Sequence, residues 1–238
     1  MSSEQNINPQ SEIRSPQSLW LVRHGQSTAN LARQKAVTEN LLTIDFPERE
    51  QNVPLSAFGE QQAAKLGEWF QKETEKPSVV FSSPFLRAGE TTRLILENAG
   101  LGETEIFYDE RLRERELGVF DRLTSLGVAE KFPAEFAARQ KVGKFYFRPA
   151  NGENWADVAL RIRSFWNEIK TDFAGENVLV VSHEAVLHLF RYIVERMTEE
   201  AILEIDRAAD IANCSITSYN LEAKTGKMIL QRENFCIV

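Results

Sequence analysis

Short apolar runs alternate with amphipathic stretches along most of the chain, and the two patterns predict different elements. Four mostly apolar runs are typical of buried strands, at residues 19–22, 79–81, 105–108 and 178–181. Apolar side chains recur every three or four positions between residues 57 and 73 and between 158 and 169, as on the buried face of a helix. Strands that alternate with helices predict a single α/β domain of three layers, with a mostly parallel central sheet flanked by helices.

The end of the chain and two internal segments depart from this alternation. Residues 215–221 and 227–230 flank a Lys-Thr-Gly turn and predict a hairpin that closes the sheet. Residues 31–53 and 123–149 lack a regular pattern, so we expect irregular insertions that are candidates for a lid. Aromatic and basic side chains in the second insertion either select the substrate or only seat the insertion on the core. They are Phe132, Phe136, Lys141, Lys144, Phe145, Tyr146, Phe147 and Arg148.

Composition narrows the class of protein. The 238-residue chain has a formal net charge of -7, so a wide basic surface for nucleic acid is not expected. A membrane span is not expected either, because no apolar run approaches the roughly 20 residues that cross a bilayer. Residues 1–17 lack the apolar core of a secretion signal and predict a mobile tail ahead of a domain at residues 18–238. Two cysteines, Cys214 and Cys236, suit a reducing compartment, with the cytoplasm as the expected location.

Basic side chains stand where three of the predicted strands end. Arg23 and His24 follow the first strand, Arg87 begins the helix after the second, and His183 follows the strand at 178–181. Ligands of parallel α/β sheets bind beyond the carboxyl ends of the strands. If the three strands are parallel neighbours, these four side chains converge at one edge of the sheet.

Two guanidinium and two imidazole groups at one site suit a phosphoryl group. Like charges repel, so the arrangement is stable only with neutral imidazoles or a bound anion, and arginine binds phosphoryl oxygens in bidentate fashion. A neutral His24 can attack phosphorus while His183 donates a hydrogen bond to the transferring group. Asn30 lies near the start of the next helix, where it caps the helix or binds the same anion. The leaving oxygen needs a proton, and composition does not choose among the acidic residues of 109–118.

Six stretches, in order along the chain, resemble motifs of one known family. They are Leu21-Val22-Arg23-His24-Gly25, Pro54-Leu55-Ser56-Ala57-Phe58-Gly59, Ser82-Ser83-Pro84-Phe85-Leu86-Arg87, Leu112-Arg113-Glu114-Arg115, Gly152-Glu153-Asn154 and Val181-Ser182-His183. The first resembles the Arg-His-Gly signature of the histidine phosphatase superfamily, in the branch that includes cofactor-dependent phosphoglycerate mutases and broad-specificity phosphatases. The fold of that family is a mostly parallel α/β sheet flanked by helices.

The resemblance also implies roles for individual residues. His24 is the residue that becomes phosphorylated, and Glu114 is the proton donor. The expected phosphate pocket and substrate contacts are Arg23, Arg87, His183, Asn30, the backbone N–H of Glu184, and Arg115. No metal and no other cofactor is implied, and the expected partner is a phosphorylated small molecule.

Departures from the family pattern favour a phosphatase over a mutase. Mutases of this group carry a tyrosine where this chain has Leu117, and Glu116 adds negative charge where a bisphosphate would lie. Glu184 puts a carboxylate beside the pocket where mutases usually have glycine. The sequence therefore predicts hydrolysis of phosphomonoesters through a phosphohistidine on His24. Two alternatives stay open: a cofactor-dependent phosphoglycerate mutase, and a regulatory protein that binds phosphate without turnover.

Overall fold

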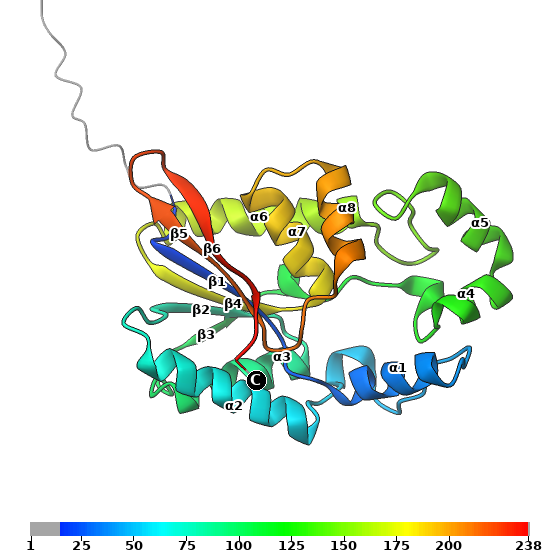
Figure 1. Ribbon diagram of the computed structural model, residues 1–238, viewed down its shortest axis with the longest axis horizontal. Coiled ribbons are helices and arrows are strands. Elements are labelled where there is room, and N and C mark those ends of the chain that lie inside the picture. The colour runs from blue at the N-terminus through cyan, green and yellow to red at the C-terminus, as the bar shows by residue number, and fades with distance from the viewer. Residues whose placement is uncertain (1–14, 238) are drawn as a thin grey trace, which may run out of the picture.

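The computed structural model describes residues 15–237, and a six-stranded sheet lies at its centre (Figure 1). The strands in chain order are β1 (Ser18–Arg23), β2 (Val79–Ser82), β3 (Ile106–Tyr108), β4 (Asn177–Ser182), β5 (Ile216–Glu222) and β6 (Lys227–Phe235). Their order in the sheet is β3-β2-β4-β1-β5-β6. The first four are mutually parallel, whereas β5 is antiparallel to both β1 and β6. The mostly parallel sheet and the closing hairpin are both confirmed.

Helices cover both faces of this sheet, as the alternating pattern predicted (Figure 1). The helices that pack on the sheet are α2 (Ala57–Lys72), α3 (Leu86–Asn98), α6 (Trp155–Asp172), α7 (Glu184–Val194) and α8 (Glu199–Ala208). Apolar side chains of α6, α7 and α8 pack against one face of the sheet, and those of α2 and α3 pack against the other. The three-layer α/β domain is therefore confirmed.

The two faces of β1 explain why its sequence is apolar at every position. Leu19 and Leu21 point into the core formed with α6 and α7, while Trp20 and Val22 point into the core formed with α2 and α3. All four side chains are buried. A strand covered on both faces needs this continuous apolar run, and a strand with one solvated face would alternate instead.

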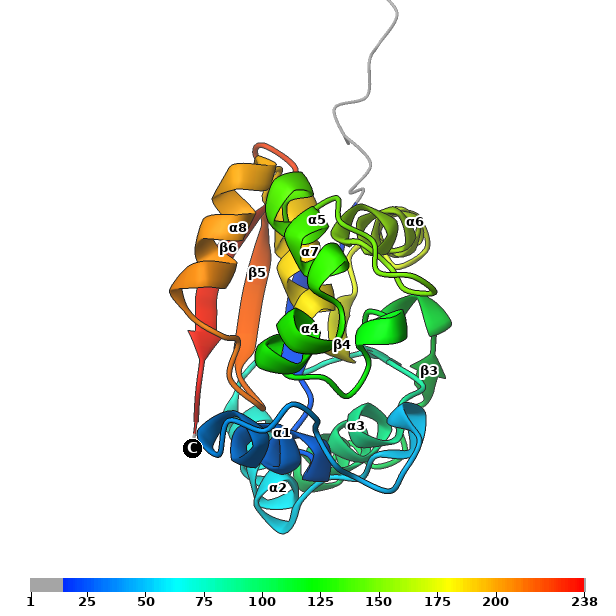
Figure 2. The same cartoon turned by 90° about the vertical axis from the view of Figure 1, so that its right-hand side faces the viewer.

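The two segments predicted to be irregular contain helices. Helix α1 (Thr28–Thr38) overlaps the first segment, while α4 (Ser125–Lys131) and α5 (Pro133–Val142) lie in the second. Helix α5 buries no side chain, and α1 buries only Ala36, so neither sequence shows the apolar period on which the prediction relied. All three helices lie together at one end of the molecule (Figure 2).

Direct hydrogen bonds join the first segment to Arg122 and Thr124, at the start of the second. The Arg122 side chain donates to the backbone oxygens of Phe46 and Glu48, at 2.6 Å each. The Thr124 hydroxyl donates to the backbone oxygen of Leu41 at 2.7 Å and also caps α4. Arg122, for which the sequence suggested no role, therefore holds the segment that leads to α2.

Ser15 and Gln17, ahead of the predicted boundary at residue 18, form backbone hydrogen bonds with the rest of the protein. The backbone oxygen of Ser15 accepts a hydrogen bond from Gly175, and the backbone N–H of Gln17 donates to Glu176 at 2.8 Å. Gln17 also accepts a hydrogen bond from Leu221, next to the hairpin turn. The segment of residues 15–17 thus hydrogen-bonds to residues beside β4 and in β5 just before β1 begins, and the remainder of the predicted tail lies outside the described residues.

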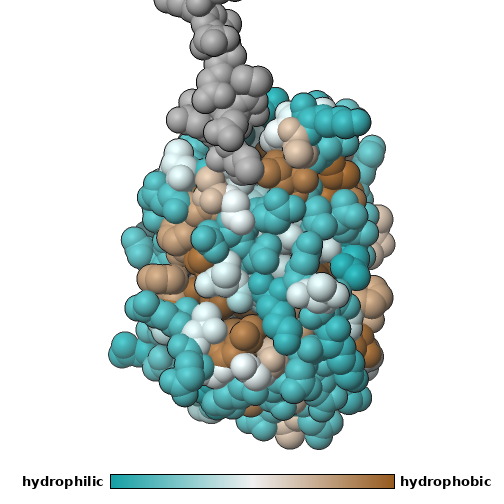
Figure 3. Space-filling model, turned by 90° about the vertical axis from the view of Figure 1, so that its left-hand side faces the viewer, coloured by the Kyte–Doolittle hydropathy of each residue, from teal (hydrophilic) through white to brown (hydrophobic). Residues whose placement is uncertain are grey.

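Figure 3 shows the end of the molecule opposite to α4 and α5, where hydrophilic side chains dominate and apolar ones form separate small patches. Among residues 15–237, no helix has both the length and the apolar character needed to cross a membrane.

Candidate active site

The connection from β1 to α1 forms one wall of the site. The backbone N–H of His24 donates to the Ser182 carbonyl of β4 at 2.9 Å, so His24 continues the sheet beyond Arg23. At Gly25 a Cβ atom would lie 2.6 Å from the carbonyl oxygen of Gly59, in the first turn of α2. Only glycine permits this close approach, which fixes the turn against the start of α2.

The parallel pairing of β1 with β4 brings the two candidate histidines together. Arg23 pairs with Ser182 in the sheet, so the residues that follow each strand, His24 and His183, emerge side by side. Their ring centroids lie 5.0 Å apart, and both side chains are buried. Arg87, in the first turn of α3 after β2, is also buried and contacts His24. The structure therefore brings Arg23, His24, Arg87 and His183 to one place.

Hydrogen bonds to both ring nitrogens assign the tautomer of His24. Nδ1 lies 2.7 Å from the backbone oxygen of Gly25, which can only accept, so Nδ1 carries the proton. Nε2 accepts a hydrogen bond from Nε of Arg87 at 3.2 Å. Burial, reinforced by the positive charges of Arg87 and Arg23, holds the pKa of His24 well below its usual value. His24 is therefore a neutral imidazole with its lone pair on Nε2.

His183 is neutral for similar reasons but keeps an unused nitrogen. Burial is the main cause that holds its pKa well below the usual value, and the positive charges of Arg87 and Arg23 reinforce it. Nε2 of His183 lies 2.8 Å from Oγ of Ser83, while its Nδ1 is buried without a hydrogen-bond partner among residues 15–237. Nε of Arg23 is likewise buried without a partner in that part of the chain. Unpaired buried polar nitrogens are costly, and an oxyanion can accept hydrogen bonds from such groups.

Two carboxylates hold the outer nitrogens of the arginines. Arg87 donates to the carboxylate and to the backbone oxygen of Glu50, at 2.8 Å each. Arg23 pairs with Glu184 at 3.1 Å and also donates to the backbone oxygen of Ile211. Burial raises the pKa of Glu50 and the pKa of Glu184. These carboxylates partly balance the positive charge of the site.

Glu114 lies on the loop that precedes the short 3-10 turn η3 (Gly118–Phe120). Its side chain is half-buried, and Oε1 accepts the backbone N–H of Arg115 at 2.7 Å. Its carboxyl group interacts electrostatically with Arg87 and with Glu50, so it lies near this arginine of the phosphate pocket.

Glu153 holds the loop that carries Glu114 through contacts with Arg113 and Glu116. Its carboxylate pairs with Arg113 at 2.8 Å and with Arg161 at 3.1 Å, and accepts the backbone N–H of Glu116 at 3.1 Å. Burial alone would raise the pKa of Glu153, but the hydrogen bond and charge of Arg161 lower that pKa below its usual value. The Gly-Glu-Asn stretch therefore positions Glu114 as well as starting α6.

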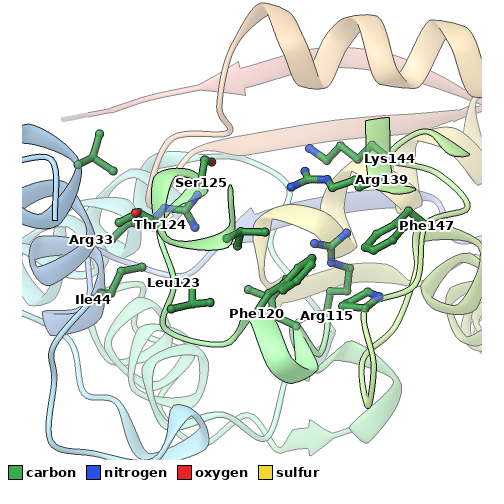
Figure 4. A pocket seen from close by; sticks show the side chains of 14 residues that line it. Arg33, Ile44, Arg115, Phe120, Leu123, Thr124, Ser125, Arg139, Lys144 and Phe147 are labelled. Atoms are coloured by element: carbon green, nitrogen blue, oxygen red, sulfur yellow. The ribbon is translucent and has the colours of Figure 1, made fainter. Parts of the chain in front are cut away.

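The other residues predicted to bind substrate, Asn30, Glu184 and Arg115, lie in three different environments. Asn30 forms a capping box with Ser27: its Oδ1 accepts the Ser27 backbone N–H at 3.0 Å, and its backbone N–H donates to the Ser27 hydroxyl at 3.2 Å. Glu184 is the first residue of α7, where backbone N–H groups have no partner within the helix. Arg115 does not contact the histidines; it lines a neighbouring cavity (Figure 4).

Three further residues support the site and had no role in the sequence prediction. Ser83 contacts His183, Glu50 holds Arg87, and Nδ2 of Asn213 donates to the His24 backbone oxygen at 2.8 Å. Ser83 lies within a quoted motif, four residues before Arg87, so the motif was a usable signal. Glu50 and Asn213 arrive from distant segments whose course no local pattern indicates.

His188 lies on α7 and is buried. Its side chain is 1% exposed, stacks on Trp155 with ring centroids 5.9 Å apart, and lies 3.9 Å from a carboxylate oxygen of Asp206. Across residues 15–237, no group of three or more His, Cys, Asp or Glu side chains is arranged to hold a metal ion.

Comparison with known proteins gives the same family as the motifs. The model of the histidine phosphatase superfamily (branch 1) matches residues 19–234. A 2,3-bisphosphoglycerate-dependent phosphoglycerate mutase from Gloeobacter violaceus is 32% identical over 190 residues, which cover 79% of this chain and 80% of that protein.

Solved structures share the fold at lower identity. The alpha-ribazole phosphatase from Shigella flexneri is 21% identical with a TM-score of 0.71, covering 93% of this chain and 98% of that one. A mycobacterial glucosyl-3-phosphoglycerate phosphatase with bound VO3 is 23% identical with a TM-score of 0.69, covering 92% and 99%. Because the family model spans nearly all of the described residues, the chain belongs to branch 1 of the histidine phosphatase superfamily.

Proposed function

We propose that this protein hydrolyses phosphomonoesters by way of a phosphohistidine. In the first step the Nε2 lone pair of His24 attacks phosphorus and the ester P–O bond breaks. Glu114 gives its proton to the leaving oxygen, so the products of this step are an alcohol and a phosphorylated His24. Arg23, Arg87 and His183 stabilise the charge on the phosphoryl oxygens as it develops.

In the second step a water molecule attacks the phosphorus of the phosphohistidine. The carboxylate of Glu114 now takes a proton from that water, the N–P bond breaks, and phosphate leaves. His24 returns to its neutral form and Glu114 to its protonated form, so one cycle consumes one ester and one water.

The unprotonated state of Nε2 in His24 is the observation that best supports the proposal. Attack requires an unprotonated nitrogen, and burial beside two guanidinium groups holds the pKa of His24 low. The hydrogen bond from Nδ1 to the Gly25 carbonyl leaves the lone pair on Nε2, beside Arg87. A site that only bound phosphate would gain more from a protonated, cationic imidazole.

A phosphoglycerate mutase is the second candidate, because the Gloeobacter relative carries that name. Glu116 and Leu117 argue against it, since they put a negative charge and an apolar side chain where mutases have His and Tyr. Turnover of phenyl phosphate by the purified protein would support a phosphatase. Conversion of 3-phosphoglycerate to 2-phosphoglycerate only when a bisphosphate is added, without phosphate release, would support the mutase. No turnover in either assay would contradict both.

The cytoplasm is our proposal for the place of action. Cys214 is buried and Cys236 is exposed, and both are free thiols, as is usual in a reducing compartment.

A further inference from the structure

Ser83 and His183 meet at the carboxyl ends of two neighbouring strands. Ser83 is the first residue after β2 and His183 the first after β4, and these strands are paired in parallel. Nε2 of His183 lies 2.8 Å from Oγ of Ser83, and both residues are fully buried. The other ring nitrogen, Nδ1, is buried with no partner among residues 15–237. One nitrogen of His183 is therefore engaged by Ser83 and the other is available.

The contacts of the Ser83 hydroxyl show in which direction this hydrogen bond runs. Its oxygen already accepts the backbone N–H of Phe85 at 3.3 Å. Within the described range 15–237, Nε2 of His183 is the one other hydrogen-bond partner of this hydroxyl, and so the one acceptor for its hydrogen. A hydroxyl hydrogen left unpaired at a buried position is costly. Ser83 therefore donates its hydrogen to Nε2.

This direction determines where His183 carries its own hydrogen. Burial, reinforced by the charges of Arg87 and Arg23, holds the pKa of His183 low, so the ring is neutral. A neutral imidazole has a hydrogen on one nitrogen only. Because Nε2 accepts from Ser83, the hydrogen must lie on Nδ1, and the hydrogen-bond network thereby assigns the tautomer. The buried nitrogen without a partner is therefore an N–H donor.

The two histidines of the site carry their hydrogen on the same nitrogen but leave different atoms available. In His24 the Gly25 carbonyl accepts from Nδ1, and Nε2 keeps its lone pair beside Arg87. In His183 the Ser83 hydroxyl occupies the lone pair of Nε2, and Nδ1–H remains. The ring centroids lie 5.0 Å apart. One ring can therefore attack phosphorus while the other donates a hydrogen bond.

We propose that Ser83 is a positioning residue, which holds the hydrogen of His183 on Nδ1, where a phosphoryl oxygen can accept it. The proposal rests on the phosphatase function, to which it adds the group that prepares His183 as a donor. The opposite tautomer has two penalties: it turns a lone pair toward the oxyanion, and it leaves the Ser83 hydrogen without an acceptor. A bound oxyanion satisfies Nδ1–H of His183 and can also accept from Nε of Arg23, the other unpaired buried donor.

Nuclear magnetic resonance of protein labelled with 15N-histidine tests the tautomer, because the nitrogen that bears the hydrogen and the bare nitrogen have well separated shifts. The chain has three histidines, and the signals of His183 are assigned by their absence from His183→Ala. Near neutral pH and without a ligand, we expect the hydrogen on Nδ1 in the wild type. In Ser83→Ala a substantial share of the molecules should carry it on Nε2. A hydrogen on Nε2 in the wild type, or an unchanged Nδ1–H in Ser83→Ala, would overturn the proposal.

Kinetics test whether the tautomer matters for turnover. Ser83→Ala is expected to lower kcat for phenyl phosphate by about tenfold and to change KM by less than about threefold, because the bond from His183 strengthens as charge develops in the transition state. A loss in KM alone, with kcat kept, would mean that Ser83 acts on binding and would overturn the proposal.

Ser82→Ala is the matched control, because it removes the same group from the adjacent residue, which is equally buried. The Ser82 hydroxyl donates to the backbone oxygen of Ser83 at 3.0 Å and accepts from Thr92 at 3.1 Å, and it contacts neither histidine of the site. This variant should keep Nδ1–H on His183 and a kcat within about threefold of the wild type. An equal loss of kcat in Ser82→Ala and Ser83→Ala would show a general effect of packing and would contradict the role of Ser83.

The tautomer is measured without turnover, so failure of this proposal can be distinguished from failure of the proposed function. Hydrogen on Nδ1 in the wild type, with a shift to Nε2 in Ser83→Ala, supports the effect of Ser83 on His183 even if no ester is hydrolysed. Turnover of phenyl phosphate by a protein whose His183 carries its hydrogen on Nε2 would support the phosphatase and overturn the role of Ser83.

Discussion

Nε of Arg87 donates a hydrogen bond to Nε2 of His24 across 3.2 Å, and both side chains are buried. This contact directs the lone pair of the candidate nucleophile toward the cation that would hold the phosphoryl oxygens. The same guanidinium also donates to Glu50 through its other two nitrogens. Arg87 therefore links the nucleophile, the phosphate pocket and the segment that precedes α2.

Replacement of Arg87 by lysine is expected to lower catalytic efficiency strongly, although the positive charge is kept. Arg87→Lys keeps the positive charge but cannot donate to His24, to Glu50 and to a phosphoryl group in the same planar geometry. We expect kcat/KM for phenyl phosphate to fall by about 10²- to 10³-fold. Thermal unfolding followed by circular dichroism would check that the variant is folded. Activity within about twofold of the wild type would remove Arg87 from transition-state stabilisation.

We expect Glu50 to compete with phosphate for Arg87 in a pH-dependent way, because its carboxylate accepts a hydrogen bond from the same guanidinium. Burial raises the pKa of Glu50, so as the pH falls through that pKa the carboxylate is neutralised and releases Arg87. As the pH rises, the carboxylate reforms and phosphate binds less tightly. Glu50→Gln is expected to bind phosphate more tightly than the wild type, with a ratio of inhibition constants that grows toward higher pH.

The inhibition constants of the variant and the wild type are compared at the same pH. Phosphate is then in the same protonation state in both measurements, so its own titration cancels. Asp45→Asn serves as the control, because Asp45 is an exposed acid of the same segment with no contact to Arg87. It should match the wild type throughout. A Glu50→Gln variant whose inhibition constants follow those of the wild type over the whole range would show that Glu50 does not compete.

The role of Glu114 as proton donor predicts a dependence on the leaving group. Alkyl phosphates have poor leaving groups that need the proton, whereas p-nitrophenyl phosphate leaves without it. Glu114→Gln is therefore expected to lower kcat/KM for butyl phosphate at least about tenfold more than for p-nitrophenyl phosphate. Glu116→Gln, two residues along and exposed, is the matched control. Equal losses on both esters would exclude Glu114 as the acid.

The low pKa of His188 predicts that the folded protein is less stable in acid. Burial lowers its pKa to about 4, against the influence of Asp206 and with help from Lys144, Arg191 and Arg23. Below pH 6.5 the unfolded chain binds a proton that the folded chain does not, so the free energy of unfolding falls as the pH falls. Between pH 7.5 and pH 5 the titration of His188 alone lowers the free energy of unfolding by roughly 2 kcal/mol.

His188→Phe tests this cost without loss of a hydrogen bond, because neither ring nitrogen has a partner among residues 15–237. The variant can keep the stacking on Trp155. Urea unfolding at pH 7.5 and at pH 5 should show a smaller loss of stability in the variant than in the wild type. The same loss in both proteins would mean that His188 titrates normally in the folded state.

The sequence predicted the central sheet because strands buried on both faces leave a strong apolar signal. The parallel order of β1, β4 and β2 then determined which strand ends meet, so the meeting of His24, His183 and Arg87 followed from the motifs. The sequence left open whether the imidazoles are neutral or an anion is bound. The tautomers could not be predicted, since they depend on contacts with Gly25 and Ser83.

The segments around the site were harder to predict for a physical reason. Helix α5 buries no side chain, so no apolar stripe distinguishes it from a loop. The aromatic residues of its segment have different roles: Phe145 is buried in the core, Phe147 lines the cavity, and Tyr146 is exposed. Phe145 therefore seats the insertion on the core, whereas selection of the substrate by its neighbours stays a prediction.

The central claim is that His24 carries the phosphoryl group during turnover. Rapid mixing with radiolabelled phenyl phosphate, followed by an alkaline quench, would trap a phosphohistidine, which survives alkali and is lost in acid. We predict an acid-labile label that mass spectrometry assigns to His24, present in the wild type and in His188→Phe and absent from His24→Ala. A protein that turns over ester with no such label, or His24→Ala that is labelled as fully as the wild type, would contradict the account.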